Sequence, residues 1–596
     1  MDEQNKNLLL ATSLSFLVLV GWMLLFPPQE IDPVVTDDSE KASTNSSGFE
    51  TNTIDSFKPL NSDLLENKEL KRIPIETARL SGSISLRGGR IDDLKLVDYF
   101  EDQSPDSNNV VILKPTSVDK SYYAVYGWTP VDGIYMDEVP NANTKWSLVS
   151  GRTLTEFDPI TIQWTNKNGV VFQRNISIDE NFMFSIEQSV LNKTSKTIKV
   201  APYGIIARHG QPETIGFYIL HEGVVGNKDG ELIERKYKKM PDQPFIKNEN
   251  GHVQLDSIQQ NGWIGFTDKY WMTTMIPQPG QSFRMATKYT PQTDTFQTDM
   301  RLPSIEVFPN QQSIIRTNFF AGAKEVNTIK KYQKELGVEN FVDSVDWGWF
   351  FFLTKPIASM LSFFNDLTGN MGWSIILLTL VIKTALFPLA YKSWVSMAKM
   401  KKLQPEMEKI KERVGDDRMK MQQELMAMYK KEKINPVAGC LPILPQIPIF
   451  FSLYKVLFVT IEVRHAPFIG WITDLSAPDP SSFLNLFGLL PFSPPDPGSF
   501  FAIFSIGVYP ILMGVTMWLQ QKLNPAPTDK TQAMIFAWMP WVFMFMLGQF
   551  ASGLVLYWVA NNAITFVQQY AIMASQGVKP DIFGNIISSF RKTKDT

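Results

Sequence analysis

Cysteine and histidine are scarce in this sequence. Among 596 residues there is one cysteine, Cys440, and there are four histidines. Because Cys440 lies in an apolar segment, the large polar part of the chain has no disulfide and must be held together by its core alone. No metal-ligand spacing surrounds the histidines, and no Walker-type glycine loop is present. We therefore expect no metal, no nucleotide or other cofactor, and no nucleic-acid partner.

Long apolar runs occur at the two ends of the chain and are separated by a polar region. Residues 8–26 carry no charge and are long enough to cross the ~30 Å hydrocarbon core of a bilayer as a helix. The leader MDEQNKN is acidic and no A-x-A cleavage site follows, so this segment is interpreted as a retained anchor and not as a signal peptide. Together the apolar runs predict six transmembrane helices, at 1–27 (the anchor), 371–391, 437–460, 500–520, 533–550 and 553–573.

Lysine and arginine are distributed unequally between the loops. The loop 392–436 carries twelve of them, whereas 461–499 carries only Arg464. Positively charged loops stay in the cytoplasm, so the first loop is predicted to be cytoplasmic and the second periplasmic. With an even number of spans, both chain ends, including the tail 574–596, are then cytoplasmic.

The polar region is predicted to contain a linker and one large domain. Residues 28–70 are acidic, rich in Ser, Thr and Asn, and poor in large apolar groups, so we expect a disordered linker. Between 71 and 340, SISLRGGRIDDLKL places a Gly-Gly turn between two candidate strands, and FSIEQSV alternates Phe184, Ile186 and Val190 with polar positions. Many such segments predict an all-β sandwich.

Two amphipathic segments flank the first apolar run that follows this domain. Residues 347–366, WGWFFFLTKPIASMLSFFND, suit a helix lying in the outer membrane interface, since Trp and Phe favour that depth. In the loop 392–436, apolar residues recur at helical spacing on both sides of GDDR (415–418), which predicts an antiparallel helical hairpin. The hairpin is either a two-helix unit with solvated outer faces or a capture surface for apolar clients, with the adaptable side chains of Met407, Met421 and Met428 as candidates.

One full charge lies inside the segment SIILLTLVIKTALFPLA (374–390). Lys383 is roughly 12–13 Å from the polar boundary at Tyr391, about twice the reach of its side chain, so it cannot snorkel. No Asp or Glu lies at a matching depth in any predicted span. Lys455, about five residues from its helix end, can reach the surface, and we assign it no role.

Polar side chains on other spans accompany Lys383. Their positions indicate either a shared hydrated interior or hydrogen bonds that join the helices. Thr379 lies one turn away, Gln446 and Phe450 share a face of the next span, and on the last span the spacing i, i+4, i+7, i+11 is occupied by Trp558, Asn562, Thr565 and Gln569.

Several segments closely resemble the bacterial YidC membrane protein insertase family. In chain order they are MGWSIILLTLVIKTALFPL, SMAKMKKLQPEMEKIKERVGDD, KINPVAGCLPILPQIPIF, RHAPFIGWITDLSAPDP, GVTMWLQQK and FASGLVLYWVANN. The motifs SLRGGRI, FFAGAKE and DWGWFFFLTKPI are similar to the Gram-negative form, which has a large periplasmic domain. In one departure, the family usually has arginine where this sequence has Lys383, so the charge is kept but the planar fork is not.

The resemblance implies a function without a covalent step, so we expect no enzyme activity and no catalytic residue. A five-helix core in the bacterial inner membrane would enclose a hydrophilic groove that inserts new membrane proteins and helps them fold, alone or with the Sec translocon. Lys383 would supply the groove charge. The exit face would be lined by Thr379, Ile447, Phe450, Met546 and Trp558, and the groove would be hydrated by Gln446, Gln520 and Asn562.

Partners and alternatives follow from the same sequence features. Nascent membrane proteins and the lipid bilayer are the expected partners, and the short tail leaves only weak docking to the ribosome. An ion- or proton-coupled transporter would also keep a buried lysine, but all four histidines lie outside the spans. The other alternative is a membrane-tethered periplasmic glycan-binding protein, with His209, His221 and Glu222 as an acid/base set.

Overall fold

The computed structural model describes most of the chain after residue 70. The described residues are 71–214, 220–415, 417–432, 434, 441–492, 495, 504–524 and 530–578. The predicted anchor (1–27) and linker (28–70) lie outside them, as do Cys440 and most of the tail 574–596.

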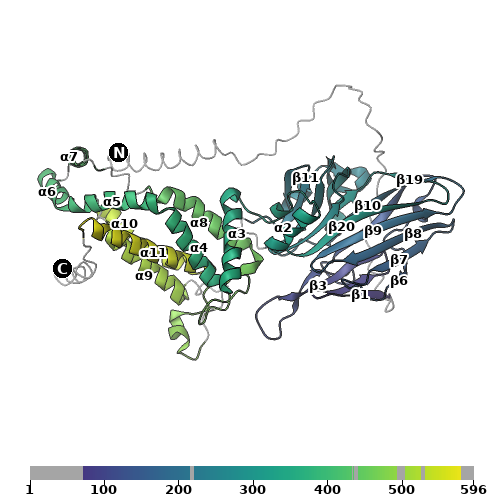
Figure 1. Ribbon diagram of the computed structural model, residues 1–596, viewed down its shortest axis with the longest axis horizontal. Helices are drawn as coiled ribbons and strands as arrows, with labels where there is room; N and C mark the ends of the chain where they lie inside the picture. Colours follow the sequence, from purple (N-terminus) through teal and green to yellow (C-terminus); the bar gives the residue numbers. More distant parts are fainter. Residues whose placement is uncertain are drawn as a thin grey trace, which may run out of the picture. The chain divides into compact units, whose positions relative to one another are not determined.

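The region predicted as all-β forms a sandwich of two antiparallel sheets, here called the β domain (Figure 1). The order along the first sheet is β1-β2-β3-β5-β10-β18-β17-β14-β13, with β4 paired to β3 and β19 to β10. Its strands are β1 (Arg72–Glu76), β2 (Leu80–Ser85), β3 (Arg90–Phe100), β4 (Asn109–Leu113), β5 (Tyr122–Asp132), β10 (Ile198–His209), β13 (Phe245–Ile246), β14 (Gly251–Ile258), β17 (Phe283–Thr290), β18 (Thr295–Arg301) and β19 (Ile305–Val307).

The second sheet has nine strands in the order β12-β11-β15-β16-β20-β9-β8-β7-β6. They are β6 (Ser147–Ser150), β7 (Ile160–Thr165), β8 (Val170–Ile178), β9 (Met183–Asn192), β11 (Gly223–Lys228), β12 (Glu231–Lys236), β15 (Gly262–Thr267), β16 (Trp271–Pro277) and β20 (Gln312–Ala323). Short 3₁₀ turns lie at Met136–Glu138, Tyr237–Asp242, Lys247–Glu249, Pro291–Thr293, Phe341–Ser344, Ile461–Val463 and Phe483–Gly488.

Both sequence signals for strands are confirmed. The Gly-Gly turn joins β2 to β3, and Gly88 and Gly89 have φ of 73° and 59°, which suits glycine. Phe184, Ile186 and Val190 on β9 are buried in the interior, as their alternation predicts.

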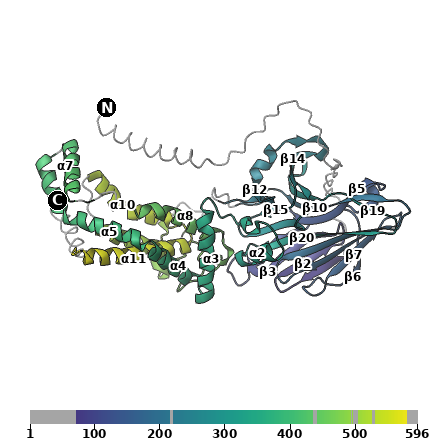
Figure 2. The same ribbon diagram turned by 45° about the horizontal axis from the view of Figure 1, so that its top comes forward.

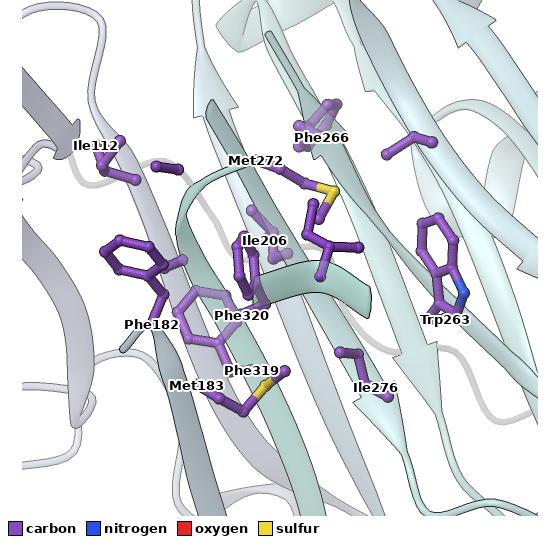
Figure 3. Packing of buried hydrophobic residues seen from close by; sticks show 14 of the residues in the cluster. Ile112, Phe182, Met183, Ile206, Trp263, Phe266, Met272, Ile276, Phe319 and Phe320 are labelled. Carbon is purple, nitrogen blue, oxygen red and sulfur yellow. The ribbon is translucent and has the colours of Figure 1, made fainter. Parts of the chain in front are cut away.

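Side chains from both sheets fill the core of the β domain. Figure 3 shows Phe319 and Phe320 of β20 beside Phe182, with Ile206 of β10 and Met272 of β16 close by. The rings of Phe182 and Phe320 meet edge to face at 6.1 Å between centroids. The domain therefore rests on packed aromatic and aliphatic side chains.

The chain after the β domain is helical. The helices α2 (Val326–Glu335) and α3 (Phe351–Thr368) come first, and α3 extends over most of the predicted interfacial segment. Four more helices carry apolar runs predicted as spans: α8 (Ile443–Val459), α9 (Val508–Leu523), α10 (Lys530–Leu547) and α11 (Ser552–Ser575). Among them α11 packs on α9 and on α8, and α10 packs on α9 (Figure 1).

The span predicted at 371–391 is broken in the structure. It consists of α4 (Met371–Ala385) and the first turn of α5 (Phe387–Lys402), which meet at a bend of 67°. Pro388 lies in the first turn of α5, where its missing N–H and its ring end the preceding helix.

Of the helices in the described residues, none is by itself both long enough and apolar enough to cross a membrane, whereas the bent pair α4–α5 meets the requirement jointly.

The predicted hairpin is confirmed. The helices α6 (Gln404–Val414) and α7 (Arg418–Lys431) lie side by side beyond the end of α5 (Figures 1 and 2). Arg413 forms an ion pair with Glu424 across the two helices, and the Tyr429 hydroxyl approaches the Met407 sulfur at 3.6 Å. The inner faces of both helices are therefore in contact.

Candidate functional site

Three polar side chains from three helices form a connected network around Lys383. The Lys383 ammonium on α4 donates to Oε1 of Gln446 on α8 at 3.2 Å. The Gln446 amide nitrogen in turn donates to the hydroxyl of Tyr557 on α11 at 2.7 Å. We call Lys383, Gln446 and Tyr557 the polar network. It ties α4, α8 and α11 together, and the two groups that follow the lysine are uncharged.

The partner of Lys383 is a neutral amide and not a carboxylate. Among the described residues, no Asp or Glu forms an ion pair with this lysine. A carbonyl oxygen stabilises an ammonium by a hydrogen bond but leaves its net charge in place. The network therefore presents one uncompensated positive charge.

An aromatic cluster adjoins the polar network on α8 and α11 and extends to α10. Phe450, one turn beyond Gln446, lies 4.6 Å from Trp558, measured between ring centroids, and Trp558 lies 6.2 Å from Phe543 of α10. We call Phe450, Phe543 and Trp558 the aromatic cluster. Ile447 and Met546 expose 49% and 53% of their surface. Apolar side chains thus remain open on α8 and α10.

Other predicted groove residues have contacts of their own. Thr379 is buried, and its hydroxyl donates to the Ile375 carbonyl of its own helix at 2.7 Å. Asn562 is buried against α9, where its amide nitrogen donates to the Thr516 hydroxyl at 3.4 Å. Gln569 makes a similar contact with Asn524, the residue that follows α9, at 3.0 Å. For Asn562 and Gln569 these contacts favour hydrogen bonding between helices, which was one of the two interpretations, and Gln520 is half-buried on α9.

The three methionines named for the hairpin are buried or half-buried. Met428 is only 9% exposed, and Met407 and Met421 are half-buried. The open thioethers are instead those of Met419, 66% exposed, and Met426, 44% exposed. The reason is the hairpin itself, because residues at the apolar spacing face the opposite helix.

The whole sequence was compared with known proteins. A family described as "60Kd inner membrane protein" matches residues 363–579, and one described as "YidC periplasmic domain" matches residues 72–360. A Dinoroseobacter shibae protein named membrane protein insertase YidC is 56% identical over 605 residues, covering 100% of this chain and 99% of its own. The chain belongs to the YidC family. A Roseobacter denitrificans protein of the same name is 55% identical over 600 residues, covering 99% of both chains.

A crystal structure of an active YidC insertase covers 85% of this chain and 93% of its own, at 17% identity and a TM-score of 0.35. Membership rests on the full-length identity to the sequence relatives. As a member of the YidC family, the chain is an inner-membrane protein, and its β domain is the periplasmic domain of that family.

A cavity of about 460 Å³ in the β domain lies apart from the predicted YidC groove residues. Its lining includes His209 and Glu222, two of the three residues considered for glycan chemistry, but not His221. The His221 ring nitrogen lies 2.8 Å from the Val224 carbonyl, and the His209 ring stacks on Tyr123. The three residues therefore do not form one acid/base set.

Tyr557 is the functional residue that sequence reasoning missed. It precedes Trp558 in a strongly apolar helix, and tyrosine is common at such positions without a polar partner. A signal was present, because Tyr557 lies one turn before Asn561, which puts two polar groups on one helix face. The bond to Gln446 depends on how the two helices approach, and one sequence does not specify that.

Proposed function

We propose that this chain inserts newly made proteins into the inner membrane, the activity for which its YidC relatives are named. The observation that carries the proposal is the Lys383–Gln446–Tyr557 network, in which a positive charge between helices is solvated by an amide and not neutralised. Such a charge can attract an acidic group that arrives from outside the protein.

The energetic obstacle to insertion is the polar flank of a client, not its apolar segment. Each Leu, Ile or Val gains a few tenths of a kcal/mol on entering lipid, whereas charged residues cost about 2.5–3.5 kcal/mol at the membrane centre. A hydrated groove shortens the dry path, and Lys383 draws in acidic residues of the flank. The side-chain oxygen of Asn561 is buried and accepts no hydrogen bond from the described residues. It therefore supports the presence of water on the face of α11 that carries Asn561 and Tyr557.

The client leaves sideways along the exposed apolar residues of α8 and α10. Ile447 and Met546 supply open contact area, and Phe450 and Trp558 supply rigid aromatic surface. We assign Thr379 and Asn562 to the packing of the groove wall because both are buried with their own hydrogen bonds. Gln520 remains a proposed hydrating residue.

The hairpin is proposed to receive apolar segments before they reach the groove. Met419 and Met426, exposed on α7, replace the inner methionines as the contact residues. The basic balance of the loop 392–436 supports its place near the anionic cytoplasmic lipid surface. From the apolar runs we propose six spans, and from the unequal distribution of Lys and Arg both chain ends in the cytoplasm. The resemblance to the family supports the Sec translocon as a partner, and the short tail leaves only weak docking to the ribosome.

Site-specific photocrosslinking tests the proposed function. A photoreactive residue at Ile447 or Met546 should crosslink to a small membrane protein during its synthesis. The matched control is Val567, also exposed, on α11, and outside the proposed exit face. Equal client crosslinking from Val567 and Ile447, or none from Ile447 and Met546, would contradict the proposal.

A further inference from the structure

A buried ion pair fixes the far end of α8. Lys455 lies on α8 one turn before its last residue, Val459, and its side chain is 7% exposed. Its ammonium lies 2.7 Å from Oδ2 of Asp346. Asp346 belongs to the short segment between the turn Phe341–Ser344 and α3. The sequence-based assignment of no role to Lys455 is therefore wrong, because this lysine has a specific partner.

The backbone around Asp346 orients its carboxylate. Oδ2 accepts a hydrogen bond from the His221 amide at 2.7 Å, and Oδ1 accepts one from the Gly348 amide at 3.2 Å. His221 precedes β11, so the first bond comes from the β domain itself. The carboxylate thus joins three parts of the chain: the β domain, the segment before α3, and α8.

The segment after Asp346 bends over the aliphatic stem of Lys455. Gly348 has φ of +70°, and a Cβ there would lie 3.4 Å from Cε of Lys455. The left-handed backbone favours glycine here, and the 3.4 Å distance is that of an ordinary van der Waals contact with the lysine stem. Trp347 between them is buried, and its indole donates to the Val342 carbonyl at 2.8 Å. The stem and the charge of Lys455 are both enclosed.

The helix that receives this anchor has an internal weak point. Pro448 lies inside α8 and has no N–H, so the helix lacks the hydrogen bond that this position would donate to the Leu444 carbonyl. The angle of the helix beyond Pro448 therefore depends on what holds its far end. That part carries Phe450, which packs against Trp558 of α11.

We infer that the Asp346–Lys455 pair is a positioning device that locks the far half of α8 to the β domain and the start of α3. It keeps Phe450 against Trp558 and so maintains the client-facing surface. The effect of this pair on client contact rests on the proposed insertase function. The anchoring of α8 by the pair does not depend on that function. Through the Asp346–Lys455 pair, the end of the β domain contributes to insertion.

Hydrogen–deuterium exchange on the full-length protein tests the anchor directly. Asp346→Asn removes the negative charge that faces the Lys455 ammonium. Because an amide keeps only one acceptor oxygen, this variant can retain the hydrogen bond from only one of His221 and Gly348. We expect amide exchange in residues 453–459 to quicken by about tenfold or more, with residues 443–447 little changed. Lys455→Met, which keeps the stem, should act on the same amides.

Two further variants separate positioning from a general loss of structure. Asp343→Asn removes the charge from a neighbouring, more exposed pair with Lys355 and should leave exchange in α8 unchanged. Combining Asp346→Asn with Lys455→Met removes both buried charges and should recover part of the protection, because no charge is left without a partner.

Client crosslinking from Ile447 supplies the functional measurement. It should fall at least about fivefold in Asp346→Asn and Lys455→Met, whereas Asp343→Asn should match the unaltered protein. Unchanged exchange at 453–459 in both single variants would overturn the inference, and so would faster exchange without loss of crosslinking. An unaltered protein that gives no crosslink from Ile447 contradicts the proposed function instead, and the exchange result still decides the anchor.

Discussion

Replacing Tyr557 by phenylalanine removes one oxygen atom from the polar network. The Gln446 nitrogen donates to that oxygen at 2.7 Å, which keeps the other side of the amide, Oε1, toward Lys383. Without the hydroxyl, the Gln446 amide is free to rotate and can turn a donor toward the lysine. The expected consequence is a less well positioned charge with the apolar wall unchanged.

The size of the effect follows from the type of bond. Hydrogen bonds between membrane helices are worth on average about 0.6 kcal/mol and at most about 1.7 kcal/mol. A loss of about 1 kcal/mol in Lys383 positioning corresponds to roughly a fivefold change in an equilibrium. Tyr557→Phe should therefore lower insertion of a client with an acidic tail by about threefold to tenfold, and should not abolish it.

The assay is protease protection of the translocated client tail in membrane vesicles. Tyr570→Phe is the matched control, because it makes the same change at an exposed position of the same helix. It should behave like the unaltered protein. A client whose tail has no acidic residue should not respond to Tyr557→Phe. Equal losses for both clients, or equal effects of the two tyrosine variants, would refute the role given to the network.

Three further predictions address the hairpin, a buried lysine and the core of the β domain. Changing Met419 and Met426 to serine should weaken client crosslinking to the hairpin, whereas the inner Met407→Leu should not, because volume is kept. Burial lowers the pKa of Lys324 from 10.5 to about 8, so between these values the unfolded chain binds more protons than the folded one. The free energy of unfolding should therefore gain up to about 1.4 kcal/mol per pH unit over that window, and denaturant titrations of Lys324→Met should lack this gain. Gly322→Ala would place a Cβ 2.3 Å from Cγ of Phe182, so calorimetry should show the β domain losing about 1–3 kcal/mol of stability.

Local sequence patterns predicted much of the fold. The alternation around Phe184 and the Gly-Gly turn specify β9 and the β2–β3 connection because both depend on neighbouring residues alone. The helix break after Ala385 could also have been predicted, since Pro388 lies in the apolar run. The prediction of one continuous span gave more weight to the hydrophobicity of the run than to this proline.

The site was predictable only in part, for a physical reason. Lys383 could be found because an unpaired charge is costly at that depth, and Gln446 shared a helix face with Phe450. Neither the Gln446–Tyr557 bond nor the Asp346–Lys455 pair could be found, since the partners lie 111 residues apart in the first case and 109 in the second. The capture role of Met407, Met421 and Met428 stays a prediction, and these side chains are less exposed than those of Met419 and Met426.

The central claim is that Lys383 acts through its charge. Its most direct test is protease protection of two matched clients, one with an acidic translocated tail and one with that tail neutralised, in the Lys383→Arg, Lys383→Ala and Lys383→Glu variants. The arginine variant should retain most activity. The alanine and glutamate variants should lose insertion of the acidic client, with glutamate the worse, and should affect the neutralised client much less. If Lys383→Ala impairs both clients equally, attraction between Lys383 and acidic residues is not what drives insertion.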